Sequence, residues 1–499
     1  MDYSIKSMRD TTKLLGSRGF IAIFSLLYFI IITRLFTKVE LSSLAIFGII
    51  TGLCSMLTGL GLSGTCLQKS PEFFARGEKA RACTLIQLST VIPLFLSFFA
   101  GGMVFLGAKQ ISQIFFKTTD FANWIKIMAF GVMAYRLHDS LSHMLMVTQK
   151  FGKLSIASMI NNIGGKIIAL AFYLLLGITG YLWGLILGYG MTVLFIVYHL
   201  RKFLFCSSRP YSLKGLVSYS FPYYINGLVR FATMQADQII IGIFLMPQQL
   251  ATYYVARRFF DYLILYVGAL LEPVLPKIAE LKSRGIQAVE KAFRKTSRYL
   301  CFSLIPVSFL VAALSYPLLQ IYGGGKYLEG TPVLVILSLT IILYGVYTIY
   351  GMNVYILGKP VEKLKQESVS SGLNVILGLL LVLPLNILGL ALARLLSFSG
   401  GGLFAGKLLK KIGKVQFDVG ALKQTLLASL AMAAFITGAQ ILYYRLYIIP
   451  LYLLLGIFIY LVIFSRYLEK EDMKLMKDFL PGRLSFLIRP LYFLGAGRN

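Results

Sequence analysis

Long apolar segments follow one another along almost the whole chain, and short loops separate them. About 20 apolar residues in a helix cross the hydrocarbon core of a bilayer. The chain has only 14% charged residues, whereas a soluble domain typically has about 25%. These features predict an all-α polytopic membrane protein, with no room for a sizeable domain outside the membrane.

We expect fourteen spanning helices, and we expect the longest of them to tilt in the bilayer or project from it. They are placed near residues 17–36, 42–66, 83–106, 121–148, 154–176, 180–200, 216–245, 249–276, 298–322, 331–357, 366–384, 387–406, 422–444 and 447–465.

The loops between these segments alternate in charge. One set of loops, together with both termini, carries 36 of the 49 Lys and Arg residues. The opposite loops hold only Arg34, Lys38, Lys109, Lys117, Lys326 and Arg445. Because basic loops stay in the cytoplasm, this asymmetry predicts a multi-pass plasma (inner) membrane protein with both termini cytoplasmic. The net charge of +29 has the same explanation, so no nucleic-acid partner is expected.

The chain also resembles itself after a shift of 209 residues. The matched positions are Ile30–Ile32 with Ile239–Ile241, Leu41 with Leu250, Lys150 with Lys359 and Gly180 with Gly389. This register predicts two pseudo-symmetric six-helix bundles, at 1–200 and 215–410, joined by a cytoplasmic linker at 201–214. Two further helices and a basic cytoplasmic tail occupy 411–499. Transporters built from parallel repeats bind substrate between the halves.

Ionisable residues inside the predicted spans are costly and usually line a cavity or contact a partner. They are Lys126, Arg136, Asp139, Lys166, Arg230, Asp237, Arg257, Arg258, Asp261, Glu272 and Arg394. Several share a helix face at spacings of three, four or seven, as Arg136, Asp139 and His143 do. Seven are basic and four are acidic, which suits an anion, and Arg can bind phosphate through two parallel hydrogen bonds. A basic, water-accessible cavity between the halves is predicted.

Short motifs in the same order and spacing make the chain resemble a known superfamily. They are Thr33-Arg34-Leu35, Leu60-Gly61-Leu62, Phe221-Pro222, Asp237 to Gly242, Tyr253 to Ala256, Leu275-Pro276, Tyr322-Gly323 and Lys326-Tyr327 before Val333 to Leu337. The chain resembles the polysaccharide-flippase branch, the Wzx-type O-antigen transporters, of the multidrug/oligosaccharidyl-lipid/polysaccharide exporter superfamily.

The resemblance implies a transporter rather than an enzyme. It would move an isoprenoid-diphosphate-linked oligosaccharide from the cytoplasmic to the outer leaflet by alternating access, for surface polysaccharide biosynthesis. Its partners would be the lipid-linked glycan, membrane lipids, a polysaccharide polymerase and glycosyltransferases, and we expect a monomer. No cofactor or metal is expected. A proton or sodium gradient, or the membrane potential, would supply the driving force.

Helical spacing and, for Arg34 and Asp237, the motif match define the candidate site. The predicted substrate-binding residues are Arg34, Arg136, Lys166, Asn226, Arg230, Arg257, Arg258 and Arg394. The predicted ion-coupling or gating residues are Asp139, Asp237, Asp261 and Glu272. For any single residue a structural role weighs as much: Arg257 or Arg258 could simply pair with Asp261 on the helix surface.

Three other functions fit the sequence less well. A peptidoglycan-precursor (lipid II) flippase would have the same plan, and growth essentiality would distinguish it. A multidrug cation antiporter of the same superfamily should have an acidic or aromatic lining, whereas these spans are net basic. A membrane-bound glycan polymerase or glycosyltransferase should show a large outer loop or an acidic metal-binding motif, and neither is visible.

Overall fold

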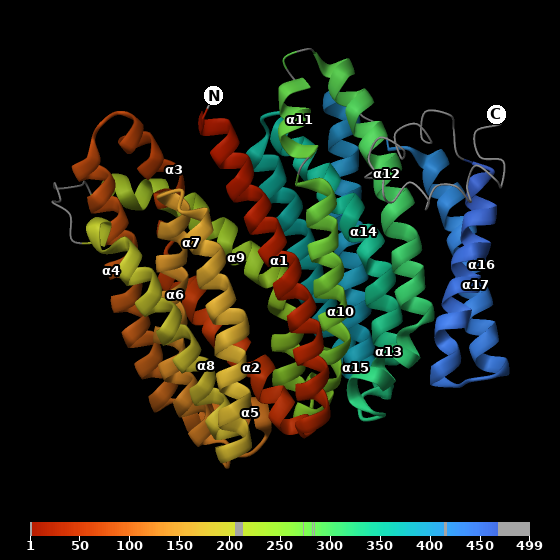
Figure 1. The fold of residues 1–499 in the computed structure, drawn as a ribbon, viewed down its shortest axis with the longest axis horizontal. Coiled ribbons are helices and arrows are strands. Elements are labelled where there is room, and N and C mark those ends of the chain that lie inside the picture. Colours follow the sequence, from red (N-terminus) through yellow and green to blue (C-terminus); the bar gives the residue numbers. More distant parts are fainter. Residues whose placement is uncertain are drawn as a thin grey trace. The chain divides into compact units, whose positions relative to one another are not determined.

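The computed structural model describes residues 2–204, 213–272, 274–281, 283, 285–413 and 417–467. Helices make up nearly all of these residues (Figure 1), which confirms the predicted all-helical membrane fold. Residues 205–212 of the predicted linker, and the basic tail beyond 467, lie outside the described residues.

Each of the fourteen predicted spans falls on one or more of the helices. The elements are α1 (Asp2–Leu35), α2 (Lys38–Gly59), α3 (Leu62–Ala75), α4 (Lys79–Leu106), α5 (Ala108–Phe116), α6 (Ala122–Val147), α7 (Phe151–Met159), the π-helix η1 (Ile160–Gly165), α8 (Lys166–Leu204), α9 (Leu213–Phe244), α10 (Pro247–Leu271), α11 (Val274–Leu281), α12 (Ile286–Ala313), α13 (Ser315–Gly323), the 3₁₀ turn η3 (Leu328–Gly330), α14 (Thr331–Ile356), α15 (Pro360–Gly413), α16 (Val419–Leu442), the 3₁₀ turn η4 (Leu446–Ile448) and α17 (Ile449–Ser465). The spans 42–66, 249–276 and 298–322 each extend over two helices, and 154–176 extends over α7, η1 and α8.

Eight described stretches are long and apolar enough to cross a membrane. Two of them, Phe151–Arg201 and Pro360–Lys411, are 51 and 52 residues long, about twice the length that a bilayer requires. Each contains one residue with a non-helical conformation, Gly177 in α8 and Asn386 in α15. Each stretch is therefore a helical hairpin that supplies two of the predicted spans.

The helices repeat in the register that the sequence comparison predicted. A shift of 209 residues carries α6 onto α14 residue for residue, and it carries the bend at Gly177 onto the bend at Asn386. Gly180 and Gly389 explain why the two hairpins bend alike, since a Cβ at either position would overlap a carbonyl oxygen of the preceding limb. These observations confirm a duplicated helical plan.

Local sequence signals mark where several helices begin. Thr37 and Glu40 form a capping box at the start of α2, in which each side chain accepts a hydrogen bond from the other residue's backbone N–H. Such a box satisfies amide groups that the first helical turn leaves without partners. Pro247 and Pro360 are the first residues of α10 and α15, a position where the missing N–H costs nothing.

The described helices group into two compact units, Met1–Tyr254 and Val255–Asn499, whose boundary lies inside α10. In the first unit, α3, α4, α6 and α8 share an apolar core that includes Leu85, Ile86 and Leu145. In the second, α12, α16 and α17 share a core around Met432 and Phe464. The predicted division into bundles at 201–214 stays a prediction.

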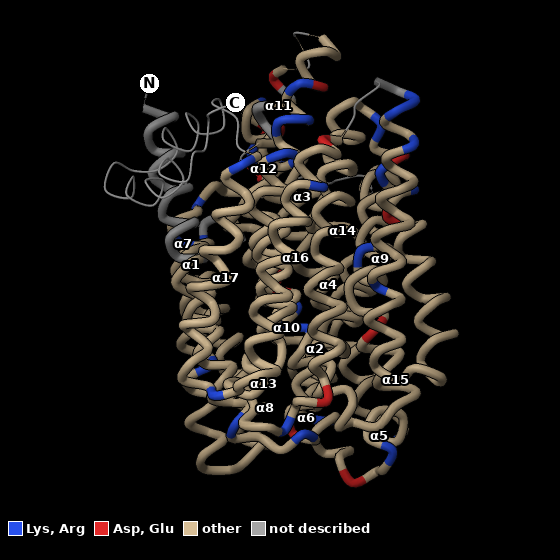
Figure 2. Tube along the Cα trace, turned by 90° about the vertical axis from the view of Figure 1, so that its right-hand side faces the viewer, with Lys and Arg blue, Asp and Glu red and all other residues tan. Residues whose placement is uncertain are grey.

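The surface of the helices suits contact with lipid. On α8, Leu174, Leu175 and Leu194 are each more than two-thirds exposed, and contiguous apolar exposure of this kind is normally covered by a membrane or a partner. Figure 2 shows Lys and Arg gathered mainly toward the ends of helices, while their middles are mostly uncharged.

Candidate functional site

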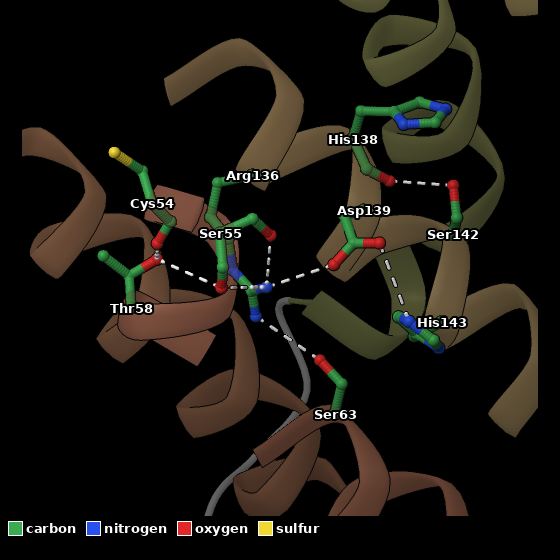
Figure 3. A network of polar contacts seen from close by, with 9 residues as sticks. All are labelled: Cys54, Ser55, Thr58, Ser63, Arg136, His138, Asp139, Ser142 and His143. Atoms are coloured by element: carbon green, nitrogen blue, oxygen red, sulfur yellow. Dashed lines mark hydrogen bonds and ion pairs between the residues drawn. The ribbon is translucent and has the colours of Figure 1, made fainter. Parts of the chain in front are cut away.

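A buried arginine on α6 is the centre of a polar network in the first unit (Figure 3). Arg136 is only 3% exposed. Its Nη1 donates to the Ser55 hydroxyl at 3.0 Å and to the Ser55 carbonyl at 3.3 Å, and its Nη2 donates to the Ser63 hydroxyl at 3.4 Å. Arg136 thus joins α6 to both α2 and α3.

Asp139 and His143 extend this network along one face of α6, as their spacing predicted. Asp139 accepts from Arg136 Nη1 at 3.1 Å, and its other oxygen lies 3.7 Å from His143 Nε2. The side chains of Asp139 and His143 are 29% and 37% exposed, whereas that of Arg136 is 4% exposed. A buried cation is therefore neutralised by a carboxylate that is partly exposed.

The break between α2 and α3 leaves space for the Arg136 guanidinium. Leu60 and Gly61 have φ values of 48° and 73°, and this left-handed pair ends α2 at Gly59. A Cβ at Gly59 would lie 3.2 Å from Arg136 Nη1, so the glycine leaves room for the guanidinium. The cation also lies near the C-terminal end of α2, where the helix dipole favours positive charge.

Arg136 retains capacity for a further ligand. Its Nε is buried and makes no hydrogen bond among the described residues. A guanidinium carries five N–H donors in a planar fork that matches phosphate oxygens. The hydroxyls of Ser55 and Ser63 are neutral acceptors, so an anionic oxygen would be a stronger partner than either.

Lys166 lies in a second polar group of the same unit. It begins α8 directly after the π-helix η1, and its Nζ donates to the Ser25 hydroxyl of α1 at 2.8 Å. The ammonium is 5.7 Å from the ring centre of Tyr28, whose hydroxyl donates to that of Tyr181 at 3.0 Å. Single-turn π-helices often occur at functional sites.

On α9 the predicted stripe runs from exposed to buried positions. Asn226 and Arg230 are exposed, whereas Thr233 and Asp237 are buried. Asp237 is fully buried and accepts hydrogen bonds from the Tyr253 hydroxyl and, at 2.9 Å, from the Gln238 backbone. A buried carboxylate that is bonded in this way fixes the end of α9 against the start of α10.

In the second unit, α10 carries three of the predicted residues, and a fourth follows directly after it. Arg257 is 3% exposed, and its Nε lies 3.6 Å from Asp261, so Arg257 makes the ion pair that the sequence left open. The Arg258 guanidinium lies 5.6 Å from the centre of the Tyr262 ring. Glu272, just after α10, is exposed.

Arg394 on α15 is fully buried, and its guanidinium lies 5.4 Å from the Phe260 ring centre. Phe260 belongs to an aromatic group with Tyr344 and Phe398, which sequence reasoning missed because its members come from three helices. Arg34, in the last turn of α1, is exposed.

The structure joins two pairs of predicted residues, Arg136 with Asp139 and Arg257 with Asp261. It places Lys166, Asp237 and Arg394 in separate groups of polar or aromatic side chains. Sequence reasoning missed Ser25, Ser55 and Ser63, since an isolated serine in an apolar segment carries no pattern of its own. The predicted cavity would include residues of both compact units, and it stays a prediction.

A family described as polysaccharide biosynthesis protein matches residues 31–332. A probable low-salt glycan biosynthesis flippase, Agl15 of Haloferax volcanii, is 25% identical over 226 residues, which are 45% of this chain. The matched region spans about half of that relative, 48% of its length.

Solved structures share the fold at low sequence identity. The lipid II flippase MurJ, in an inward closed conformation, matches with a TM-score of 0.75 at 16% identity, over 91% of this chain and 98% of that one. An inward-facing multidrug resistance MATE family transporter of the MOP superfamily matches with a TM-score of 0.65 at 14% identity, over 79% and 96%. These matches confirm the predicted all-helical fold.

Proposed function

The chain belongs to the polysaccharide biosynthesis protein family, and from this premise we propose that it is a flippase for an isoprenoid-diphosphate-linked oligosaccharide. It would carry the diphosphate and sugars from the cytoplasmic to the outer leaflet of the plasma membrane by alternating access, and it would catalyse no covalent reaction. Both termini would be cytoplasmic, because the loops on their side carry most of the basic residues.

The Arg136 network is the observation that carries this proposal. A diphosphate cannot enter hydrocarbon unless protein groups replace its water, because an unpaired charge in an apolar medium is very costly. Arg136 offers a buried guanidinium with an unused donor, and its only described ion-pair partner is the partly exposed Asp139. We infer that the substrate phosphate displaces Ser55 and Ser63 from the guanidinium and competes with Asp139.

The same exchange suggests how transport is driven. When phosphate occupies Arg136, Asp139 loses its cationic partner, and release of the phosphate restores the ion pair. Asp139, which is partly exposed, is the carboxylate that we propose couples the transport cycle to a proton gradient, with His143 as its neighbour 3.7 Å away.

Flipping in proteoliposomes tests the proposal. A fluorescent isoprenoid-diphosphate oligosaccharide is placed in both leaflets, and its movement is followed by the loss of label accessible to an external glycosidase. We expect R136A to abolish flipping and R136K to retain a small fraction, because Lys lacks the planar fork. R81A is the matched control, since Arg81 forms an exposed pair with Glu78. Flipping by R136A at the wild-type rate would contradict the proposal.

A further inference from the structure

The break between α2 and α3 packs directly against the start of α9, within the first unit. A Cβ at Gly61 would lie 2.7 Å from the Tyr224 backbone nitrogen and would overlap the Ser220 carbonyl. A Cβ at Gly64 would lie 2.7 Å from the Tyr223 ring. Only glycine allows two backbones to approach as closely as those at Gly61 and Tyr224 do, and Gly64 leaves room for the Tyr223 ring.

Neutral hydrogen bonds cross this contact. The Thr65 and Ser220 hydroxyls are 2.8 Å apart and nearly fully buried. The Tyr223 hydroxyl donates to the Gln68 side chain. A neutral hydrogen bond contributes about 0.5–1.5 kcal/mol net. The surfaces are close in shape, and neutral hydrogen bonds of this size suit a contact that must open and close.

Both partners contain residues that interrupt or weaken the helix at the contact. On one side, Leu60 and Gly61 interrupt the helix with left-handed backbone angles. On the other side, Pro222 lies inside α9, between the contacting residues Ser220 and Tyr223. A proline inside a helix removes one backbone hydrogen bond and bends the helix. Either helix can therefore pivot at the contact without unfolding.

The opposite end of α9 is held differently. Lys117, just after α5, donates from its Nζ to the Ile243 carbonyl at 2.5 Å and to the Gly242 carbonyl at 3.4 Å. These carbonyls belong to the last turn of α9, where a cation is favourable. At the other end, Lys69 of α3 lies 4.8 Å from the centre of the Tyr219 ring, which is a contact with a side chain rather than with helix-end carbonyls, and both partners carry a helix-breaking residue there.

The break also connects this contact to the candidate site. Arg136 approaches it from α6, through Ser55 and Gly59 before the break and Ser63 after it. A ligand that draws Arg136 away from these groups would therefore also affect the break between α2 and α3, which contacts α9.

We propose that Gly61, Gly64, Thr65 and Gln68 form a releasable latch with Ser220, Tyr223 and Tyr224, and that this latch closes the cytoplasmic end of the transport path. This inference rests on the proposed function, which supplies the direction of transport and the transported substrate. In each cycle the latch opens to admit substrate from the cytoplasm and closes before the outer side opens.

A reversible disulfide tests the latch. T65C and S220C are introduced together into the full chain after its five native cysteines are replaced by alanine, because two bonded hydroxyls can be replaced by a disulfide of similar reach. A third cysteine, S142C on α6, reports access from the cytoplasmic side through a membrane-impermeant maleimide in inside-out vesicles. Oxidation precedes labelling, and cross-linking is scored after cleavage at a protease site inserted in 205–212.

We expect efficient cross-linking, at least a fivefold loss of labelling at S142C, and loss of flipping that a reductant restores. On oxidation, the T65C and S220C single variants should each keep the labelling and flipping that they show when reduced. Unchanged labelling of the cross-linked protein would overturn the latch, as would failure of the two cysteines to cross-link. If the parent protein does not flip the glycan at all, the proposed function fails, and the labelling result still decides the latch.

Discussion

Asp139 accepts a hydrogen bond at 3.1 Å from the same Arg136 nitrogen that donates to Ser55. One guanidinium nitrogen thus joins a carboxylate on its own helix to a hydroxyl on another. The carboxylate is partly exposed while the guanidinium is buried. The carboxylate is therefore the more accessible partner, and this asymmetry makes the pair suited to exchange.

Replacing Asp139 by asparagine should separate coupling from binding. The amide keeps the shape of the side chain but cannot take up a proton, so D139N should lose the acceleration that a pH gradient gives while still exchanging substrate at equilibrium. We expect at least a tenfold smaller response to the gradient in proteoliposomes. D120N is the control, because Asp120 is exposed and bonds only locally to Thr118. A normal gradient response in D139N would exclude this residue as the coupling site.

Lys166 should matter through its charge more than through its hydrogen bond. K166M removes the ammonium that bonds to Ser25, and we expect flipping to fall about tenfold, in line with a charged hydrogen bond worth about 1.5–3 kcal/mol. S25A should lose less, because the cation remains. K153M on α7 is the matched control in flipping assays. If S25A were as impaired as K166M, the contribution of Lys166 would be structural.

The hairpin of α8 should depend on glycine at one position and not at another two residues away. A Cβ at Gly188 would lie 2.7 Å from the Gly165 Cα, whereas nothing lies within 4 Å of a Cβ at Gly190. We expect G188A to lower stability by about 1–3 kcal/mol, as overpacking does, and G190A to be neutral or slightly stabilising. Thermal unfolding in detergent measures the stability of both variants. Equal unfolding temperatures for G188A and G190A would contradict this prediction.

The contact of Lys117 with the carbonyls at the end of α9 should contribute a small part of the free energy of unfolding. K117M removes the cation from the Gly242 and Ile243 carbonyls, and a charge at a helix end contributes about 0.3–1 kcal/mol. We expect a small fall in the unfolding temperature for K117M and none for K109M, since Lys109 is exposed on α5. Faster amide exchange in the last turn of α9 would locate the effect, and unchanged exchange there would contradict the cap.

Much of the fold was predictable because lipid imposes strong rules on sequence. Segment length and loop charge depend on the bilayer alone, so the fourteen spans fall on described helices. The 209-residue register was predictable for the same reason, since residues such as Gly180 and Gly389 are required by two equivalent bends. The break at Leu60–Gly61 was missed as a break, although its residues were noted as a motif.

The site was less accessible to sequence reasoning. The spacing on α6 correctly placed Arg136, Asp139 and His143 together, because residues on one helix face need no knowledge of tertiary structure. Partners on other helices, such as Ser55, Ser63 and Ser25, depend on packing that no local pattern encodes. The polar residues on one face of α9 look alike in the sequence but differ in burial, since Arg230 is exposed while Asp237 is fully buried.

Binding of an isoprenoid diphosphate to the purified full chain tests the central claim most directly, namely that Arg136 holds the phosphate. Dissociation constants are measured by titration for the wild type, R136A, R136K and the R81A control, with unfolding temperatures recorded for each. We predict that R136A binds at least tenfold more weakly, R136K falls between, and R81A matches the wild type, consistent with about 1.5–3 kcal/mol for a charged hydrogen bond. Equal affinity of a folded R136A and the wild type would contradict the account.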